Sequence, residues 1–381
     1  MKTSPQDNAA MLPRRGLTAI ALSAIAAWTL PETILAQSAP PGLSANATVV
    51  AHGFDNPRGL KFGPDGLLYV AEAGQGGTAS SPIGLCPQAA PPGPYTNGPT
   101  ARISRISAAG VRQTVVAGLP SGLSANGDVM GVSDIAFVGN TLYALLAGGG
   151  CSHGQTQGPA GVLRLQSDGT MAVVADLGAF QKANPVKAPV SYDFDPDGTW
   201  YGMAAWGSDV YAVESNHGVL LRVSAQGAVS RVADISAEAG HRVPTAIAFS
   251  PQGQAYVAGL GRWPFRPEEG VIWRVEPSGA LTRMAHGLVG LLGIAFDTQG
   301  RLYALEVGRA QNKVPIPGTG RVVRVTLNSS GSGSVQLQEI ASGLMFPTTL
   351  ISGPDGALYV TNNGFGFPPG GGEVVRITIP N

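Results

Sequence analysis

GLKFGPDGLLYVAEA, residues 59–73, is an apolar run, a two-residue turn and a second apolar run that contains one tyrosine. The same arrangement returns five more times, at residues 132–147, 201–215, 245–260, 292–307 and 348–363. Turn dipeptides such as Asp65-Gly66 and Asp355-Gly356 supply the positive φ angles that tight antiparallel hairpins need. The chain is therefore expected to contain six hairpins of one kind.

A third and a fourth strand are expected to follow the hairpins. Each hairpin precedes a variable loop and a short apolar segment with one arginine, and the first five also precede a further segment, as at residues 113–117 and 337–341. The sixth hairpin lacks this fourth segment, but residues 48–52 (TVVAH) have its character and stand before the first hairpin. Four strands repeated at a spacing of about 50 residues are typical of a β-propeller. The prediction is an all-β, six-bladed β-propeller of four-stranded antiparallel blades, in which the N-terminal strand closes the last blade.

Two residues recur at fixed places in the repeat, and both are expected to serve the fold. Six of the nine tyrosines share one position in the second strand, which predicts packing between blades. An arginine recurs in every third strand, where it should pair with acids or backbone on the flank of its blade. The tyrosines are Tyr69, Tyr143, Tyr211, Tyr256, Tyr303 and Tyr359, and the arginines are Arg105, Arg164, Arg222, Arg274, Arg324 and Arg376.

Composition and the N-terminal segment indicate where the protein works. The 381 residues carry a formal net charge of zero and no basic blocks, which excludes the charge pattern of a DNA- or RNA-binding protein. Arg14 and Arg15 precede an uncharged run at residues 17–30 that is too short to span a bilayer. We expect an export signal at residues 1–36, a linker at 37–44 and the propeller at 45–381, in a periplasmic or extracellular protein with no membrane span in its mature part. An uncleaved anchor is the alternative.

Cys86 and Cys151 are the only cysteines of the chain. Both lie in Gly-rich loops that join second to third strands, on adjacent blades and on one face, so a disulfide between them is geometrically sensible in an oxidising compartment. Two unpaired thiols are the alternative. Zinc is excluded because a structural zinc site needs four clustered ligands.

Repeat geometry predicts a polar site at one mouth of the central channel. The start of a hairpin's first strand lies beside the end of its second strand, and the innermost strands line the channel. Carboxylate and amide side chains at second-strand ends would therefore meet there, in an oxygen-rich cage of the kind that suits Ca²⁺. The alternatives are a structural network of ion pairs and water, and catalytic carboxylates with raised pKa values. The candidate metal ligands are Glu72, Glu214, Glu306 and Asn362.

Aromatic residues are expected to gather at the same mouth, where they could stack on a ligand. Packing of the long loops onto the disc is the alternative. His153 and His217, in or near these loops, are candidate bases. The candidate ligand-binding residues are Arg58, Tyr201, Trp263, Phe265, Phe365 and Phe367.

Segments 56–78, 131–138, 243–250 and 358–365 resemble the ScyD/ScyE family of secreted propellers, which are related to NHL-repeat proteins. The resemblance extends over residues 46–380. It implies a six-bladed propeller and export, without an established reaction. Acidic residues typical of the family are replaced by Gly259 and Gly293, so this mouth is less acidic. More distant six-bladed propellers include calcium-dependent lactonases and gluconolactonase-like hydrolases.

Signatures of standard catalytic sites are absent from the sequence: it contains no G-x-S-x-G, no H-E-x-x-H and no phosphate-binding P-loop. The first hypothesis is therefore a module that binds a small molecule, a glycan or an envelope protein through its loop-bearing face. The second is a calcium-assisted hydrolase of lactones or esters at the channel mouth. The third is a structural scaffold.

Overall fold

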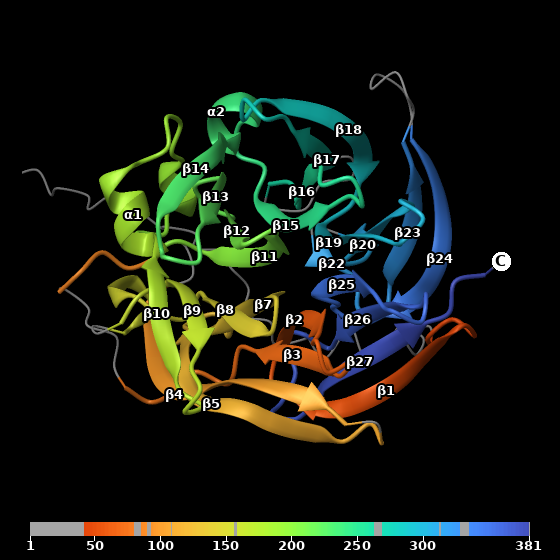
Figure 1. The fold of residues 1–381 in the computed structure, drawn as a ribbon, viewed down its shortest axis with the longest axis horizontal. Coiled ribbons are helices and arrows are strands. Elements are labelled where there is room, and N and C mark those ends of the chain that lie inside the picture. The colour runs from red at the N-terminus through yellow and green to blue at the C-terminus, as the bar shows by residue number, and fades with distance from the viewer. Residues whose placement is uncertain are drawn as a thin grey trace, which may run out of the picture.

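The fold is a six-bladed β-propeller, in which six antiparallel sheets surround a central axis (Figure 1). The structure is a computed structural model that describes residues 42–79, 85–89, 93–107, 109–155, 158–262, 269–311, 314–327 and 335–380. The predicted export signal, 1–36, and most of the predicted linker lie outside these ranges. The predicted fold class is confirmed.

Blades 1 to 3 follow one another along the chain, each with its first strand at the hub. Blade 1 is formed by β2 (Pro57–Phe62), β3 (Leu68–Glu72), β4 (Tyr95–Ile106), β5 (Arg112–Ser124) and the short fifth strand β6 (Val129–Met130). Blade 2 is formed by β7 (Val132–Val138), β8 (Thr141–Leu146), β9 (Gly161–Leu165) and β10 (Met171–Asp176). Blade 3 is formed by β11 (Trp200–Trp206), β12 (Asp209–Glu214), β13 (Val219–Val223) and β14 (Val229–Asp234).

Blades 4 to 6 repeat this order. Blade 4 is formed by β15 (Pro244–Phe249), β16 (Ala255–Gly259), β17 (Gly270–Val275) and β18 (Leu281–Leu288). Blade 5 is formed by β19 (Leu291–Phe296), β20 (Leu302–Glu306), β23 (Gly320–Thr326) and β24 (Gln336–Leu344), with the small hairpin β21 (Ala310–Gln311) and β22 (Val314–Pro315) inserted. Blade 6 is formed by β25 (Thr349–Ser352), β26 (Leu358–Asn362) and β27 (Gly372–Ile377), and its outermost strand is β1 (Ala47–Phe54).

The ring closes through pairing between the two ends of the propeller. β1 runs antiparallel to β27, with Thr48 opposite Arg376 and His52 opposite Glu373. Asn46 adds two side-chain hydrogen bonds, to the carbonyls of Ile340 (2.8 Å) and Thr378 (2.9 Å). The predicted closure by an N-terminal strand is confirmed, and it gives blade 6 its fourth strand.

The repeat tyrosines and arginines serve the fold as expected. In all six blades the tyrosine stands directly opposite the arginine across the second and third strands, as Tyr69 does to Arg105. The Tyr69 ring meets Phe137 of the next blade edge-on, with centroids 5.1 Å apart, and equivalent contacts recur between other blades. Phe62 and Tyr359 make this contact across the closure, also at 5.1 Å. The tyrosines thus join neighbouring blades.

Two short helices were not anticipated. α1 (Leu177–Ala183) and α2 (Ile235–Ala239) follow the outer strands of blades 2 and 3. Asp176 and Asp234 cap their N-termini by accepting hydrogen bonds from Ala179 and Ala237. Within the described ranges, no helix has both the length and the apolar composition that crossing a bilayer requires.

Candidate functional site

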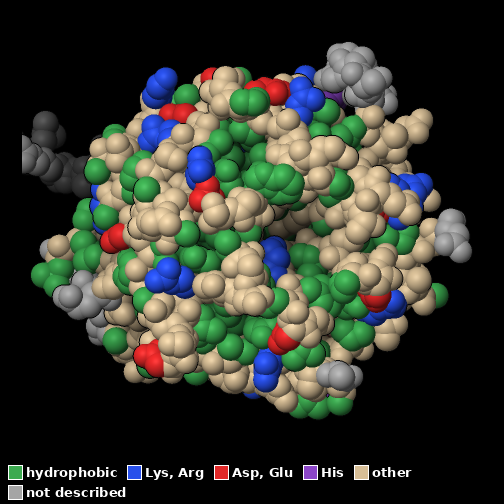
Figure 2. Space-filling model, in the orientation of Figure 1, with side chains coloured by type: hydrophobic (Ala, Val, Ile, Leu, Met, Phe, Trp, Pro, Cys, Tyr) green, Lys and Arg blue, Asp and Glu red, His purple; other side chains and the backbone are tan. Residues whose placement is uncertain are grey.

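A cavity of about 340 Å³ opens at the hub of the propeller, and we call it the hub cavity. It lies at the predicted mouth, because its walls include residues that directly follow second strands, such as Ala73, Ala147 and Val307. The space-filling view shows the hub hollowed (Figure 2). Below Arg58 and Tyr201 the channel continues only as a space of about 20 Å³, close to the size of one water. A ligand would therefore have to enter and leave through the mouth.

The lining of the hub cavity differs between its two halves. Blades 4 to 6 contribute mainly apolar side chains, while blades 1 to 3 and the loops before them contribute most of the polar ones. The apolar half includes Val243, Leu260, Leu292, Val307 and Phe365. The polar half includes Arg58, Asn126, Asp128, Asp193, Tyr201 and Asn216, beside apolar side chains such as Met130 and Trp200.

Arg58 is the basic side chain of the hub cavity. It follows Pro57 at the start of β2, and its guanidinium Nη2 donates to the Val129 carbonyl (2.9 Å) and lies 3.4 Å from Asp128. Its Cζ lies 5.9 Å from the centroid of the Phe365 ring, within the range of a cation–π contact. These contacts hold the guanidinium at the boundary between the polar and the apolar half.

Two tyrosines accompany Arg58 on the wall of the hub cavity. Burial raises the pKa of the Tyr201 phenol, and the nearby Arg58 guanidinium opposes that rise. Burial, together with Asp128 and Asp195, raises the pKa of Tyr95 well above its ordinary value. Both phenols therefore keep their protons at neutral pH and can donate hydrogen bonds there.

Asp193 brings a second acid to the wall, in the short 3₁₀ helix Ser191–Asp193 that precedes blade 3. One carboxylate oxygen accepts a hydrogen bond from the Asn216 side chain, and the other lies 2.8 Å from Nε2 of His241. The Tyr192 ring meets the His241 ring edge-on at 5.7 Å. Both oxygens of Asp193 are thus already engaged by the protein.

Three residues at the mouth have a left-handed backbone conformation. Each stands just before a proline, at or near the start of the first strand of a blade. Asn56, Val243 and Phe346 have φ angles of 48°, 50° and 42°, and each precedes a proline. Each turned carbonyl accepts a hydrogen bond from just beyond the second strand of its blade, as Val243 does from Leu260 (2.9 Å). For a β-branched residue such as Val243 this conformation is strained. The strain lies in the wall of the hub cavity.

The four predicted metal ligands do not lie together in the hub cavity, since none of them lines it. Each accepts a hydrogen bond from a backbone N–H just before the first strand of its own blade. The described residues contain no group of three or more acidic, histidine or cysteine side chains able to hold a metal ion. The pairs are Glu72 with Asp55 (2.7 Å), Glu214 with Thr199 (2.8 Å), Glu306 with Val289 (2.8 Å) and Asn362 with Met345 (2.7 Å).

Arginines compensate two of these three glutamates. Arg102 lies 2.8 Å and Arg112 lies 3.4 Å from Glu72, and Arg321 pairs with Glu306. The structural network that the sequence left open as an alternative therefore accounts for these side chains. The contacts give a shared calcium cage no support.

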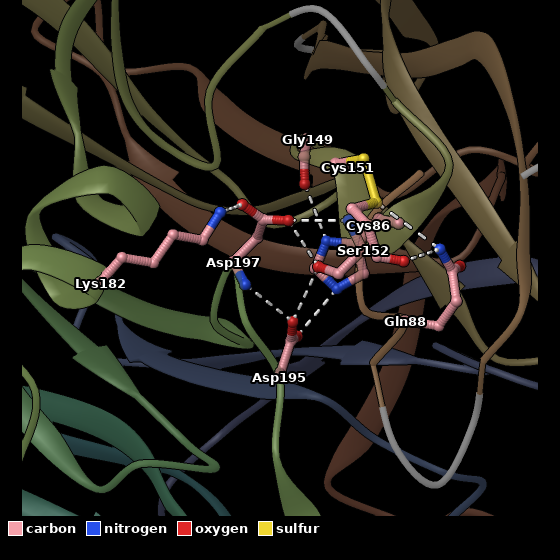
Figure 3. Close-up of a disulfide and its surroundings, with 9 residues drawn as sticks. Cys86, Gln88, Gly149, Cys151, Ser152, Lys182, Asp195 and Asp197 are labelled. Carbon is pink, nitrogen blue, oxygen red and sulfur yellow. Dashed lines mark hydrogen bonds and ion pairs between the residues drawn. A yellow bond between two sulfur atoms is a disulfide. The ribbon is translucent and has the colours of Figure 1, made fainter. Parts of the chain in front are cut away.

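The predicted disulfide is present, between Cys86 and Cys151, with Cα atoms 6.1 Å apart (Figure 3). Beside it, Ser152 donates to Asp195 (3.0 Å) and Asp197 (2.7 Å), and Lys182 pairs with Asp197. The bond and these polar contacts attach the loop of Cys86 to blade 2 and to the segment before blade 3.

The two histidines proposed as bases are held by the protein. Nε2 of His153 lies 2.8 Å from Asp195, and Nδ1 lies 2.8 Å from the Gly149 carbonyl. Burial opposes its charged form, but Asp195, the Gly149 carbonyl and Asp197 together outweigh burial and raise the pKa of His153 to about 9. Nε2 of His217 is 2.7 Å from the Asp195 carbonyl. Ser152 bonds to aspartates instead of His153, so these residues do not form a nucleophile–base pair.

Of the six predicted ligand-binding residues, the structure brings three together in the hub cavity: Arg58, Tyr201 and Phe365. Phe367 instead packs against Phe346, with ring centroids 6.4 Å apart. Trp263 and Phe265 lie outside the described residues. For Phe367, the alternative of loop packing is the one observed.

Sequence reasoning did not single out Asn126, Asp128, Asp193, Asn216 or His241. All of them stand outside the hairpin repeat, Asp193 in a short 3₁₀ helix and the other four in loops, so no repeat position marked them. The pairing of Asp193 with His241 joins loops nearly 50 positions apart, which only the folded chain reveals.

Comparisons with known proteins identify the fold of the chain but not its family. No protein-family model and no curated protein matches the chain. Among solved structures, a protein from Thermus thermophilus that is provisionally described as an oxidoreductase (glucose dehydrogenase) shares 17% identity, with 88% of this chain and 100% of that chain covered and a TM-score of 0.55. A Bacteroides thetaiotaomicron protein of unknown function has 10% identity, coverages of 88% and 76%, and a TM-score of 0.54.

A further structure, named glucose dehydrogenase, has 16% identity, coverages of 88% and 99%, and a TM-score of 0.54. At these identities the likeness establishes a shared propeller fold alone. The resemblance to the ScyD/ScyE family stays a prediction.

Proposed function

We propose that this protein is an exported propeller that binds a small, partly apolar molecule in the hub cavity. The observation that carries the proposal is the cavity itself. Its volume of about 340 Å³ falls within the range of roughly 300–1,000 Å³ that is usual for small-molecule sites. An apolar wall and a polar wall that face each other suit a ligand with an apolar body and a polar head.

The cavity favours a small molecule over the two other ligands that the sequence left open. A glycan or an envelope protein would need a broad surface of exposed aromatic or apolar side chains. Phe365 and Tyr201 stand in the wall of the cavity instead, and Phe367 packs on Phe346. Tyr201 and Phe365 therefore support binding inside the hub, while the exposed aromatic side chains Tyr192, Phe194 and Trp206 do not line the cavity.

Export is part of the proposal. Residues 1–36 have the pattern of an export signal, and a disulfide such as Cys86–Cys151 persists in oxidising compartments. The residues that resemble the ScyD/ScyE family agree with this location, and we infer a relationship to that family from them.

The calcium-assisted hydrolase is the less favoured function. It would require Glu72, Glu214 and Glu306 to share one ion, whereas each accepts hydrogen bonds within its own blade. A purely structural scaffold would have no need of a hub cavity with an amphipathic lining.

The proposal is tested by screening a library of small amphipathic molecules against the mature protein in a thermal-shift assay. We expect hits whose stabilising effect disappears in Asn126→Trp, which fills the hub cavity from a half-buried part of its wall. Asn140→Trp, in the exposed turn between β7 and β8, is the matched control and should keep every hit. A complete absence of hits, or hits that survive Asn126→Trp, would contradict the proposal.

A further inference from the structure

The polar half of the hub cavity presents hydrogen-bond donors that the protein leaves for other partners. Tyr95 is only 2% exposed and lines the cavity, and its hydroxyl makes no hydrogen bond to a described residue. The hydroxyl oxygen itself is not enclosed by protein, so it faces the space of the cavity, where water or a ligand can reach it. The Tyr95 hydroxyl is therefore available to hydrogen-bond to a ligand in the cavity.

Arg58 supplies further donors beside this hydroxyl. Nη2 donates to Val129 and Asp128, and the guanidinium also interacts with the Tyr201 hydroxyl, so a positive charge and a tyrosine hydroxyl stand side by side in the wall. The Arg58 side chain is 12% exposed and forms part of the wall of the hub cavity. A guanidinium edge of this kind matches the geometry of a carboxylate.

The acids of the cavity are less available than these donors. Both oxygens of Asp193 are engaged, by Asn216 and His241. Asp128 lies beside Arg58, and its side chain is 44% exposed, so water screens its charge. The acids that a cationic head would need are thus already paired or screened, whereas the Tyr95 hydroxyl has no hydrogen bond to a described residue.

We propose that the ligand of the hub cavity is a carboxylic acid with an apolar body, its carboxylate held by Arg58 and by the hydroxyls of Tyr95 and Tyr201. This inference rests on the proposed function and names the chemical class of its ligand. The apolar body lies against the wall formed by blades 4 to 6, with Phe365 closest to the head because it stacks under the Arg58 guanidinium. The raised pKa values of both tyrosines keep these hydroxyls protonated as donors at neutral pH.

The test uses three probes that share one body and differ in the head: 4-phenylbutyrate, 4-phenylbutanamide and 4-phenylbutylamine. Titration calorimetry on the mature protein should show the carboxylate binding at least about tenfold more tightly than the amide, and the amine more weakly still. Arg58→Gln and Tyr95→Phe should each bring the affinity for the carboxylate down toward that of the amide. Arg58→Lys, which keeps the charge and loses the planar fork, should give an intermediate loss.

Matched controls separate the site from the fold. Arg164→Gln and Tyr143→Phe remove the same groups from the repeat positions of blade 2, away from the hub cavity, and should leave all three affinities unchanged. Equal binding of carboxylate and amide, or tightest binding of the amine, would overturn the head-group assignment while the hub cavity still binds ligands. Binding of none of the three probes would overturn both this assignment and the proposed function.

Discussion

The carboxylate of Glu214 accepts a 2.8 Å hydrogen bond from the backbone N–H of Thr199. Glu72, Glu306 and Asn362 accept the same kind of bond in blades 1, 5 and 6. The side chain at the end of the second strand therefore anchors the loop that leads into its own blade. Glu214 differs from the other two glutamates, because no lysine or arginine pairs with it among the residues that the structure describes.

Because Glu214 has no basic partner among the described residues, the stability of the protein should depend on pH. Burial raises the pKa of Glu214 from 4.5 to about 7, with His217 opposing the rise and Asp195 adding to it. The folded protein thus keeps a proton that the unfolded chain has released. The resulting stability is fully present below pH 4.5 and is lost as the pH rises through about 7.

Urea unfolding of wild type and Glu214→Gln across this range measures the effect. From pH 4.5 to about pH 8, the wild type should lose up to about 3 kcal/mol relative to Glu214→Gln. Glu306→Gln is the control, and it should destabilise throughout because it breaks the pair with Arg321. If the unfolding free energies of wild type and Glu214→Gln changed in parallel with pH, the Glu214 carboxyl would not be the source of the pH dependence.

Glu72 should behave as a structural ion-pair partner and not as a metal ligand. It is fully buried and pairs with Arg102 and Arg112, so Glu72→Gln should cost about 2 kcal/mol of unfolding free energy by removing these charged contacts, while Arg102 keeps its pair with Asp55. For each protein, wild type or variant, the melting temperature measured in excess calcium should equal the one measured in excess chelator. If calcium raised the melting temperature of the wild type but not that of Glu72→Gln, the result would support a metal site at Glu72.

Val243 should be a position where glycine stabilises the protein. Its φ of 50° is unfavourable for a β-branched side chain, and glycine adopts this conformation freely. Val243→Gly should therefore raise the unfolding free energy by about 1 kcal/mol, as measured in urea. Val111→Gly, at an exposed position that has no left-handed backbone, should instead lower it slightly. A loss of stability in Val243→Gly would mean that the lost side-chain packing outweighs the strain.

The disulfide should contribute measurably to stability. Cys86 and Cys151 are 65 positions apart, and a crosslink closing a loop of this length typically adds about 2–4 kcal/mol. Cys86→Ser with Cys151→Ser should lower the melting temperature, and reductant should lower that of wild type toward the same value. Reductant should leave the double variant unchanged. An unaltered wild-type melting temperature after confirmed reduction would contradict this expectation.

The architecture could be predicted because the repeat carries it locally. The turn dipeptides, the tyrosine of the second strand and the arginine of the third strand recur within single hairpins, and Tyr69 opposite Arg105 is one instance of a pairing found in six blades. Even the closing strand was visible, since residues 48–52 supplied the one strand that the last repeat lacked. The helices α1 and α2 were missed although Asp176 and Asp234, which cap their N-termini, are typical helix-capping residues. Both residues lie outside the hairpin repeat.

The site was only partly predictable. Arg58, Tyr201 and Phe365 were found because first-strand starts and mouth loops converge on the hub. The same reasoning put Glu72, Glu214 and Glu306 there as well, yet each turns to a backbone N–H of its own blade. Repeat position specifies where a Cα lies, but it does not specify which partner a carboxylate takes.

By itself, the sequence determined the number of blades, their order and the strand that closes the ring, because hairpin geometry depends on residues close together in the chain. Only the tertiary structure decided which side chains face the hub cavity, that Asp193 is held by His241, and that the Tyr95 hydroxyl lacks a partner among the described residues. The reason is physical. A hydrogen-bonded side chain settles on whichever donor or acceptor folding brings within about 3 Å, and that choice depends on loops from several blades at once.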